Sequence, residues 1–162
     1  MSSSGVYWGQ SFTTVTIGPE SNIAFNLFSD VPATTPYAVG TGFLLSMAYT
    51  GTPSSLTSAT PGFLGQATAS GGFWTFNSSL TLLPNTQYFF YENAPLGSIS
   101  GNNFYAGGQY YYSFSGSDNF NPAGASINFR VTGLPVPDAG STLPLLGFAL
   151  AGVAVLRRKL RC

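Results

Sequence analysis

The chain has 162 residues, of which only 6% are charged and 15% are aromatic, with no histidine and one cysteine, Cys162. Low charge is common in disordered segments, but these have few aromatic and apolar residues, so this chain is expected to fold. A single cysteine excludes a disulfide framework and a thiolate metal cluster, and the lack of histidine excludes His-based catalytic triads and most zinc sites.

Charge is distributed unevenly along the chain. Four of the five basic residues lie within the last six positions, and Arg130 is the only one before them. Five carboxylates precede the basic end, so this larger part carries a net charge of −4. Nucleic-acid binding needs basic surface to neutralise phosphates, so the composition excludes nucleic acid as a partner.

Residues 10–131 read as short strands separated by turn residues. Strands rich in β-branched and aromatic residues are predicted at 10–17, 21–29, 41–49, 63–69, 73–76, 110–114 and 125–131. Within the second of these, Ile23, Phe25 and Leu27 recur at a period of two and predict one buried face. Two further apolar runs flank Pro84-Asn85, where proline suits the second turn position and asparagine tolerates left-handed geometry.

About eight to ten short strands, with no amphipathic helix of ten residues or more before the C-terminal tail, predict an all-β fold. The sequence favours a single antiparallel β-sandwich over residues 1–133, with jelly-roll topology because the domain is larger than an immunoglobulin fold of ~100 residues. The pattern Leu80-x-Leu82-x-Pro84-x-Thr86-x-Tyr88-x-Phe90 resembles pieces of extracellular β-sandwich domains in general and names no single family.

Catalytic candidates are few, and no cofactor is predicted. The carboxylates Glu20, Asp30, Glu92 and Asp118 leave a two-carboxylate hydrolase as a weak alternative, since nothing in their spacing brings a pair together. Residues 115–121 offer several oxygen atoms but only one carboxylate, so a hydrogen-bonded turn is favoured there over a calcium site.

Carbohydrate binding is the stronger alternative, because exposed aromatic faces can stack on sugar rings. Candidate residues for stacking are Trp74, Tyr105 and Tyr111, with Trp8, Phe104, Tyr110 and Tyr112 as further aromatic candidates. In a strand, Tyr110 and Tyr112 share one face while Tyr111 points to the other, so either a tyrosine faces outward or both faces are buried. Core packing explains most aromatic residues in a chain of this composition, so the sugar-binding hypothesis competes with simple burial.

The C-terminal segment has three parts in a fixed order. A linker at 134–142 contains Val136-Pro137-Asp138-Ala139-Gly140, an apolar run follows at 143–156, and the basic residues Arg157, Arg158, Lys159 and Arg161 complete it. This order predicts a helix that enters a membrane with residues 157–162 held on the cytoplasmic side. Fourteen helical residues span roughly 21 Å, short of a bilayer core of ~30 Å, which favours a transient signal over a permanent anchor.

These residues resemble the VPDSG-CTERM sorting signal of the PEP-CTERM class, with Ala139 where that motif has serine. The resemblance covers residues 136–162 alone. It implies an exported bacterial protein processed by an exosortase-like membrane protease.

The favoured function is therefore a non-enzymatic surface or extracellular-matrix protein, sorted through its C-terminal signal and anchored in the membrane at least transiently. A module that binds matrix polysaccharide is the alternative. Residues 1–8 contain no basic or apolar signal-peptide region, so an exported protein is expected to have its start codon upstream of Met1.

Overall fold

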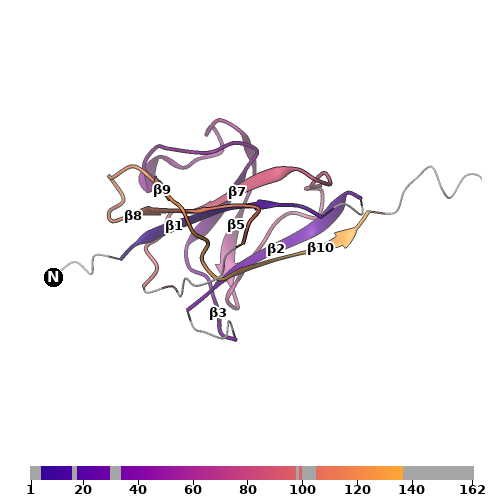
Figure 1. The fold of residues 1–162 in the computed structure, drawn as a ribbon, viewed down its shortest axis with the longest axis horizontal. Coiled ribbons are helices and arrows are strands. Elements are labelled where there is room, and N and C mark those ends of the chain that lie inside the picture. The colour runs from indigo at the N-terminus through magenta and orange to yellow at the C-terminus, as the bar shows by residue number, and fades with distance from the viewer. Residues whose placement is uncertain (1–4, 16–17, 30–33, 98, 100–104, 137–162) are drawn as a thin grey trace, which may run out of the picture.

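The computed structural model describes residues 5–15, 18–29, 34–97, 99 and 105–136, which form an all-β antiparallel fold (Figure 1). The strands are β1 Tyr7–Thr13, β2 Glu20–Phe28, β3 Pro36–Tyr37, β4 Thr41–Leu45, β5 Phe63–Ser70, β6 Phe73–Thr75, β7 Gln87–Glu92, β8 Tyr110–Ser113, β9 Asn121–Ala123 and β10 Phe129–Pro135. The helical structure in this part of the chain is one 3₁₀ turn, η1 Pro53–Ser55. The predicted all-β class and the predicted eight to ten strands are confirmed for the described residues, whereas the strand order is that of one curled sheet and not of the expected jelly-roll sandwich.

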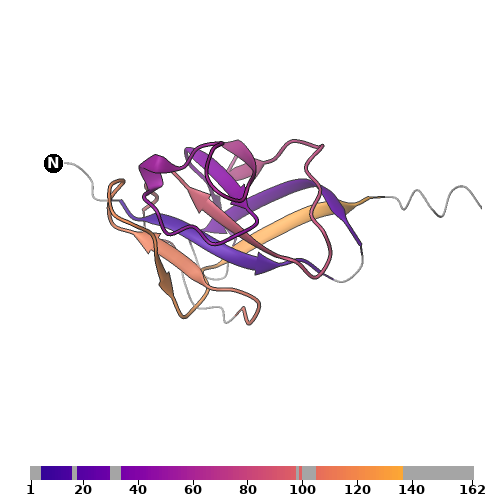
Figure 2. The ribbon, with the colours of Figure 1, turned by 90° about the horizontal axis from the view of Figure 1, so that it is seen from above.

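The strands form one continuous, strongly curled sheet in the order β10-β2-β6-β5-β4-β7-β1-β8-β9, with β3 added beside β2. Strand β5 joins its two halves, because residues up to Thr68 pair with β4 while Ala69 and Ser70 pair with β6. The curl brings β2 and β6 opposite β1, β4 and β7, because side chains of these strands share one core. Figures 1 and 2 show the curled body in two views at right angles.

The two facing layers expected of a sandwich thus come from one sheet rather than from two separate ones. The physical reason lies in the turn at Gly71 and Gly72, whose φ angles of 58° and 85° favour glycine. This tight turn returns the chain beside β5, so β6 extends the sheet that β5 already belongs to.

The main core fills the space between the two halves. Ile23, Phe25 and Leu27 are fully buried there, which confirms the face predicted from their period-two spacing. Phe25 stacks on Phe90 across the core, with ring centroids 4.0 Å apart and planes inclined by 13°. Trp74 packs against the same Phe90 ring at 4.7 Å. The aromatic contacts therefore hold the two halves of the sheet together.

A second, smaller core lies on the outer face of β4, β7 and β8. Its buried members are Phe43, Leu45, Leu56, Phe89, Tyr91, Tyr111 and Phe120. Strand β7 is buried on both faces from Tyr88 to Glu92, which explains its nearly continuous apolar sequence.

The predicted turn at Pro84-Asn85 is present, and Asn85 adopts the left-handed conformation with φ 51°. The apolar run before it does not form a long strand. Leu82 instead makes an isolated bridge to Glu20, in which each backbone N–H donates to the other residue's carbonyl oxygen at 2.8–2.9 Å.

Among the described residues, strand β10 is an edge strand that pairs only with β2, and it contains an irregularity between Thr132 and Leu134. It continues to Pro135, two residues into the segment expected to be a linker. Its end lies at the right of Figure 1, opposite the start of β1. The predicted membrane helix at 143–156 and the basic cluster at 157–162 fall outside the described residues. Within the described ranges, no helix has the length and apolar character to cross a membrane.

Candidate functional site

The predicted sorting motif begins directly where the folded body ends. Val136 follows the last residue of β10, and its N–H donates to the carbonyl oxygen of Pro19 at 2.9 Å. The other motif residues, Pro137, Asp138, Ala139 and Gly140, lie outside the described residues, as do Arg157, Arg158, Lys159 and Arg161. The structure therefore fixes the position of the first motif residue at one end of the sheet.

Of the three residues predicted to stack on sugars, Trp74 and Tyr111 are buried and Tyr105 is half-buried. Trp74 is fully buried on β6, so its ring faces contact the core and are not available to a ligand. Tyr105 is half-buried, and its hydroxyl bonds both the N–H and the carbonyl oxygen of Thr13 at 3.0 Å. Its ring also meets Phe129 edge to face at 5.4 Å. Full burial shows that Trp74 is not a sugar platform, whereas the stacking role of Tyr105 stays a prediction.

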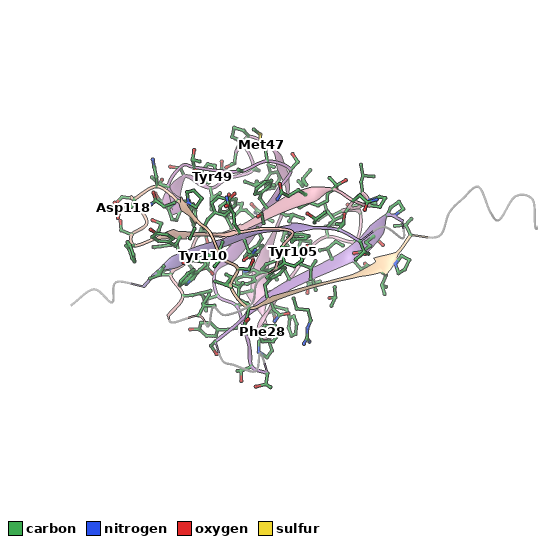
Figure 3. The ribbon with its side chains drawn as sticks, viewed as in Figure 1. Phe28, Met47, Tyr49, Tyr105, Tyr110 and Asp118 are labelled. Atoms are coloured by element: carbon green, nitrogen blue, oxygen red, sulfur yellow. The ribbon has the colours of Figure 1, made fainter. Side chains whose placement is uncertain are left out.

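The tyrosines of β8 divide between its two faces as expected. Tyr111 belongs to the second core and has 4% of its surface exposed. On the other face, half-buried Tyr110 and Tyr112 continue a row of neighbouring rings from Trp8 to Phe114, with centroid distances of 5.8, 6.1 and 5.2 Å. Phe114 is 64% exposed, whereas Tyr110 lies further into the body (Figure 3). We call these four residues the aromatic row; Phe104 lies outside the described residues.

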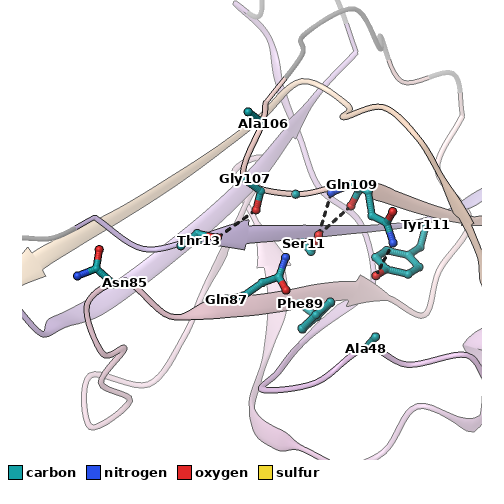
Figure 4. Close-up of a pocket in the computed structure, with 11 residues that line it drawn as sticks. Ser11, Thr13, Ala48, Asn85, Gln87, Phe89, Ala106, Gly107, Gln109 and Tyr111 are labelled. Atoms are coloured by element: carbon teal, nitrogen blue, oxygen red, sulfur yellow. Dashed lines mark hydrogen bonds between the residues drawn. The ribbon is translucent and has the colours of Figure 1, made fainter.

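A groove of about 680 Å³ lies on the outer face of β7 and β1, beside the second core (Figure 4). Its floor is built from the directly opposed pairs Ser11–Phe89 and Thr13–Gln87. Residues 106–109 form one wall, while Ala48 and Asn85 lie at its margins. Tyr111 also lines it. None of the eleven lining residues carries a charge.

Hydrogen bonds attach the 106–109 wall to β1. The N–H of Ser11 donates to the carbonyl oxygen of Gln109 at 2.9 Å, and the N–H of Gln109 donates to Ser11 Oγ at 2.8 Å. Thr13 Oγ1 donates to the carbonyl oxygen of Gly107 at 3.1 Å. Gly108 is required for this approach, because a Cβ atom there would collide with the Ser11 carbonyl oxygen. The wall therefore extends the pairing of β8 with β1 toward the start of β8 and is attached to β1 by these hydrogen bonds.

The groove presents amide groups with spare hydrogen-bonding capacity. Gln87 and Asn85 are exposed, and their side chains make no hydrogen bond within the described part of the chain. Gln109 donates through Nε2 to the Tyr111 hydroxyl at 3.0 Å, which leaves its carbonyl oxygen as an acceptor. Of these groove residues, sequence reasoning identified only Tyr111, because single glutamines and asparagines belong to no motif. The signal that was available is Gln87, a single polar residue directly before the continuous apolar run of β7.

The acidic candidates occupy different environments. Glu92 is fully buried; its Oε1 accepts from the Trp8 N–H at 3.0 Å, and its Oε2 has no partner among the described residues. Burial raises the pKa of Glu92 well above its usual value, and the Trp8 hydrogen bond opposes this rise, so burial favours the protonated carboxyl. Glu20 lines an opening between β1 and β10, Asp118 is exposed, and Asp30 lies outside the described ranges.

The loop considered for calcium is a hydrogen-bonded turn. Ser113 Oγ donates to the carbonyl oxygens of Ser115 and Asp118, and the Asp118 N–H donates back to the Ser115 carbonyl oxygen. In the described part of the chain, no three Asp, Glu, His or Cys side chains gather where they could hold a metal ion.

Comparison with known proteins identifies the C-terminal segment. Residues 135–160 match the VPDSG-CTERM motif, a C-terminal sorting signal. This signal implies an exported protein that reaches the cell surface and is processed by an exosortase-type system. No curated protein and no solved structure matches the chain significantly. The predicted resemblance of the tail is thereby confirmed.

Proposed function

We propose that this chain is a non-enzymatic bacterial surface or matrix protein, sorted and cleaved through its C-terminal signal. The observation that carries the proposal is the match at residues 135–160, which begins at the last residue of β10. Folded body and signal are therefore adjacent, with Pro135 common to both. In this proposal, residues 143–156 hold the tail in the membrane transiently and the basic cluster keeps its end cytoplasmic.

The placement of β10 supports this arrangement. Because β10 is an edge strand with one neighbour, the chain leaves the sheet without passing between other strands. Its exit lies at the end of the body opposite the start of β1 (Figure 1). The aromatic row and the β8–β9 pair lie toward the start of β1, so the proposed attachment point and this surface are at opposite ends.

The test is cell fractionation of a bacterium that carries an exosortase-type system and expresses the full gene. We expect the wild-type body outside the cytoplasm, with mass spectrometry showing a C-terminus near residues 136–140. The double substitution Pro137→Ala and Asp138→Ala should leave the uncleaved chain in the membrane fraction.

The matched control is Pro61→Ala with Asp118→Ala, which changes the same residue types in exposed loops of the body. This control should be processed like wild type. A cytosolic wild-type protein, or equal processing of the motif variant and wild type, would contradict the proposal.

The non-enzymatic part of the proposal rests on the available chemistry. The chain has no histidine, and Glu92 is enclosed in the interior while Glu20 and Asp118 lie on separate elements. The competing hydrolase hypothesis predicts new reducing ends when the purified chain is incubated with polysaccharides. We expect no release above buffer, and release abolished by Glu20→Gln or Asp118→Asn would establish the hydrolase instead.

A further inference from the structure

We infer that the groove formed by β7, β1 and residues 106–109 is a binding site for uncharged saccharide chains. This inference concerns the folded body and goes beyond the proposed sorting function. It assigns a ligand class to Gln87, Gln109 and Asn85, which no motif identifies.

The groove offers polar groups of a kind that suits sugar hydroxyls. A carboxamide has both donor and acceptor atoms, and sugar hydroxyls need both. Gln87 and Asn85 keep both kinds of atom unpaired within the described residues, while Gln109 retains its acceptor oxygen. Three such groups around one depression can bond successive hydroxyls of a saccharide. No hydrogen bond within the protein needs to break, because Gln109 can accept through its oxygen while its Nε2 still donates to Tyr111.

The lining of the groove is uncharged. No lining residue is ionisable near neutral pH, and the described part of the chain contains one cation, Arg130, on the edge strand β10. Binding of phosphates, sulfated sugars or uronic acids favours Arg or Lys at the site. The groove lacks any such group, so its chemistry favours neutral sugars.

The groove has the size of a ligand site and is built on hydrogen-bonded backbone. The volume of about 680 Å³ lies within the range of ligand sites, and the Phe89 ring contributes an apolar patch to a floor that is otherwise polar. The floor consists of paired strands, and the opposite wall is fixed by Ser11, Thr13 and Gly108. A preformed site loses little conformational freedom when it binds, which raises its affinity for a ligand such as a polysaccharide segment.

The experiment is affinity electrophoresis of the full chain, purified in a detergent without a sugar head group. The gels contain a neutral glucan, a neutral galactomannan or the acidic polymer polygalacturonate. We expect at least one neutral polymer to retard the wild type and polygalacturonate to have no effect. Gln87→Ala should weaken this retardation about fivefold, as the loss of one hydrogen bond predicts.

Two controls locate the site. Gln66→Ala removes an exposed glutamine from β5, outside the groove, and should bind like wild type. Tyr112→Ala removes a ring from the aromatic row on the opposite face of β8 and should also bind like wild type.

Three results would overturn the inference. These are no retardation by either neutral polymer, wild-type retardation of Gln87→Ala, and loss of binding in Tyr112→Ala alone. The last result would assign saccharide binding to the aromatic row. Sorting is read independently by fractionation, so failure here would leave the proposed function standing.

Discussion

At the scale of single residues, Glu92 makes the stability of the protein depend on pH. The folded state keeps this buried carboxyl protonated above pH 4.5, where the carboxyl of the unfolded chain ionises. The unfolded state then binds fewer protons, so the free energy of unfolding falls as pH rises from about 4.5 toward the raised pKa. The slope from this one group is at most ~1.4 kcal/mol per pH unit.

We therefore expect Glu92→Gln to abolish this slope and to be more stable than wild type at pH 7, because glutamine does not ionise and keeps an acceptor for the Trp8 N–H. Urea unfolding of the full chain at pH 4, 5, 6 and 7 measures how the free energy of unfolding depends on pH. Glu20→Gln, at a carboxyl that lines a surface opening, is the matched control and should keep the wild-type slope. Parallel curves for wild type and Glu92→Gln would show that Glu92 is ionised in the folded protein.

At the scale of elements, the segment 105–109 depends on close contact with β1. Gly108→Ala places a methyl group against the Ser11 carbonyl oxygen, so the backbone must move and the Ser11–Gln109 bonds must weaken. Overpacking of this kind costs about 1–3 kcal/mol. Thermal unfolding should show a lower Tm, and hydrogen exchange should be faster at the Ser11 and Gln109 amides.

Gly124→Ala is the control, since a Cβ atom at Gly124 meets no atom within 4 Å. Equal Tm values and equal exchange rates for the two variants would mean that the 105–109 segment is not held by close backbone contact. A Gly108→Ala protein that stays folded should also bind neutral polymers more weakly, because this segment is the groove wall.

The strands and turns also show which features of the fold can be predicted from the sequence. Periodicity identified the buried face of β2, and local backbone chemistry identified the left-handed turn at Asn85, because both depend on neighbouring residues only. Strand β9 was expected to be loop, since Asn121-Pro122-Ala123 has no strand pattern and forms a strand only against the available edge of β8. Trp74 shows the same limit, because burial of a lone tryptophan depends on the distant Phe25 and Phe90.

At the scale of the whole molecule, the shared strand β5 and the Phe25–Phe90 stack predict that both halves of the sheet unfold together. The fluorescence of the two tryptophans reports on unfolding at two places, with Trp8 on β1 and Trp74 on β6. In Trp74→Phe and in Trp8→Phe, the remaining fluorescence change should coincide with the loss of far-UV circular dichroism during urea unfolding. Separate midpoints within one variant would show that the halves are independent folding units.

The candidate groove likewise depends on the fold of the whole molecule. Ser11, Gln87 and Gln109 are distant in sequence and become neighbours only when β7, β1 and the segment before β8 align. The sorting signal is the opposite case, because its three parts are contiguous and its order alone identifies it. Sequence therefore predicted the delivery of the protein better than the surface on its folded body.

The exposed edge of β10 bears on whether copies of the protein aggregate when many of them lie close together on a cell surface. An unpaired edge strand is a template on which a second copy could add its own strand. Here the edge carries the exposed Arg130, whose guanidinium lies 5.2 Å from the Phe28 ring centroid, followed by the irregularity at Gly133 and by Pro135. A charge, a break in register and a residue without an N–H each oppose such addition. Copies crowded side by side on one cell should therefore remain separate molecules rather than merge into fibrils, even though the body has few charges for mutual repulsion.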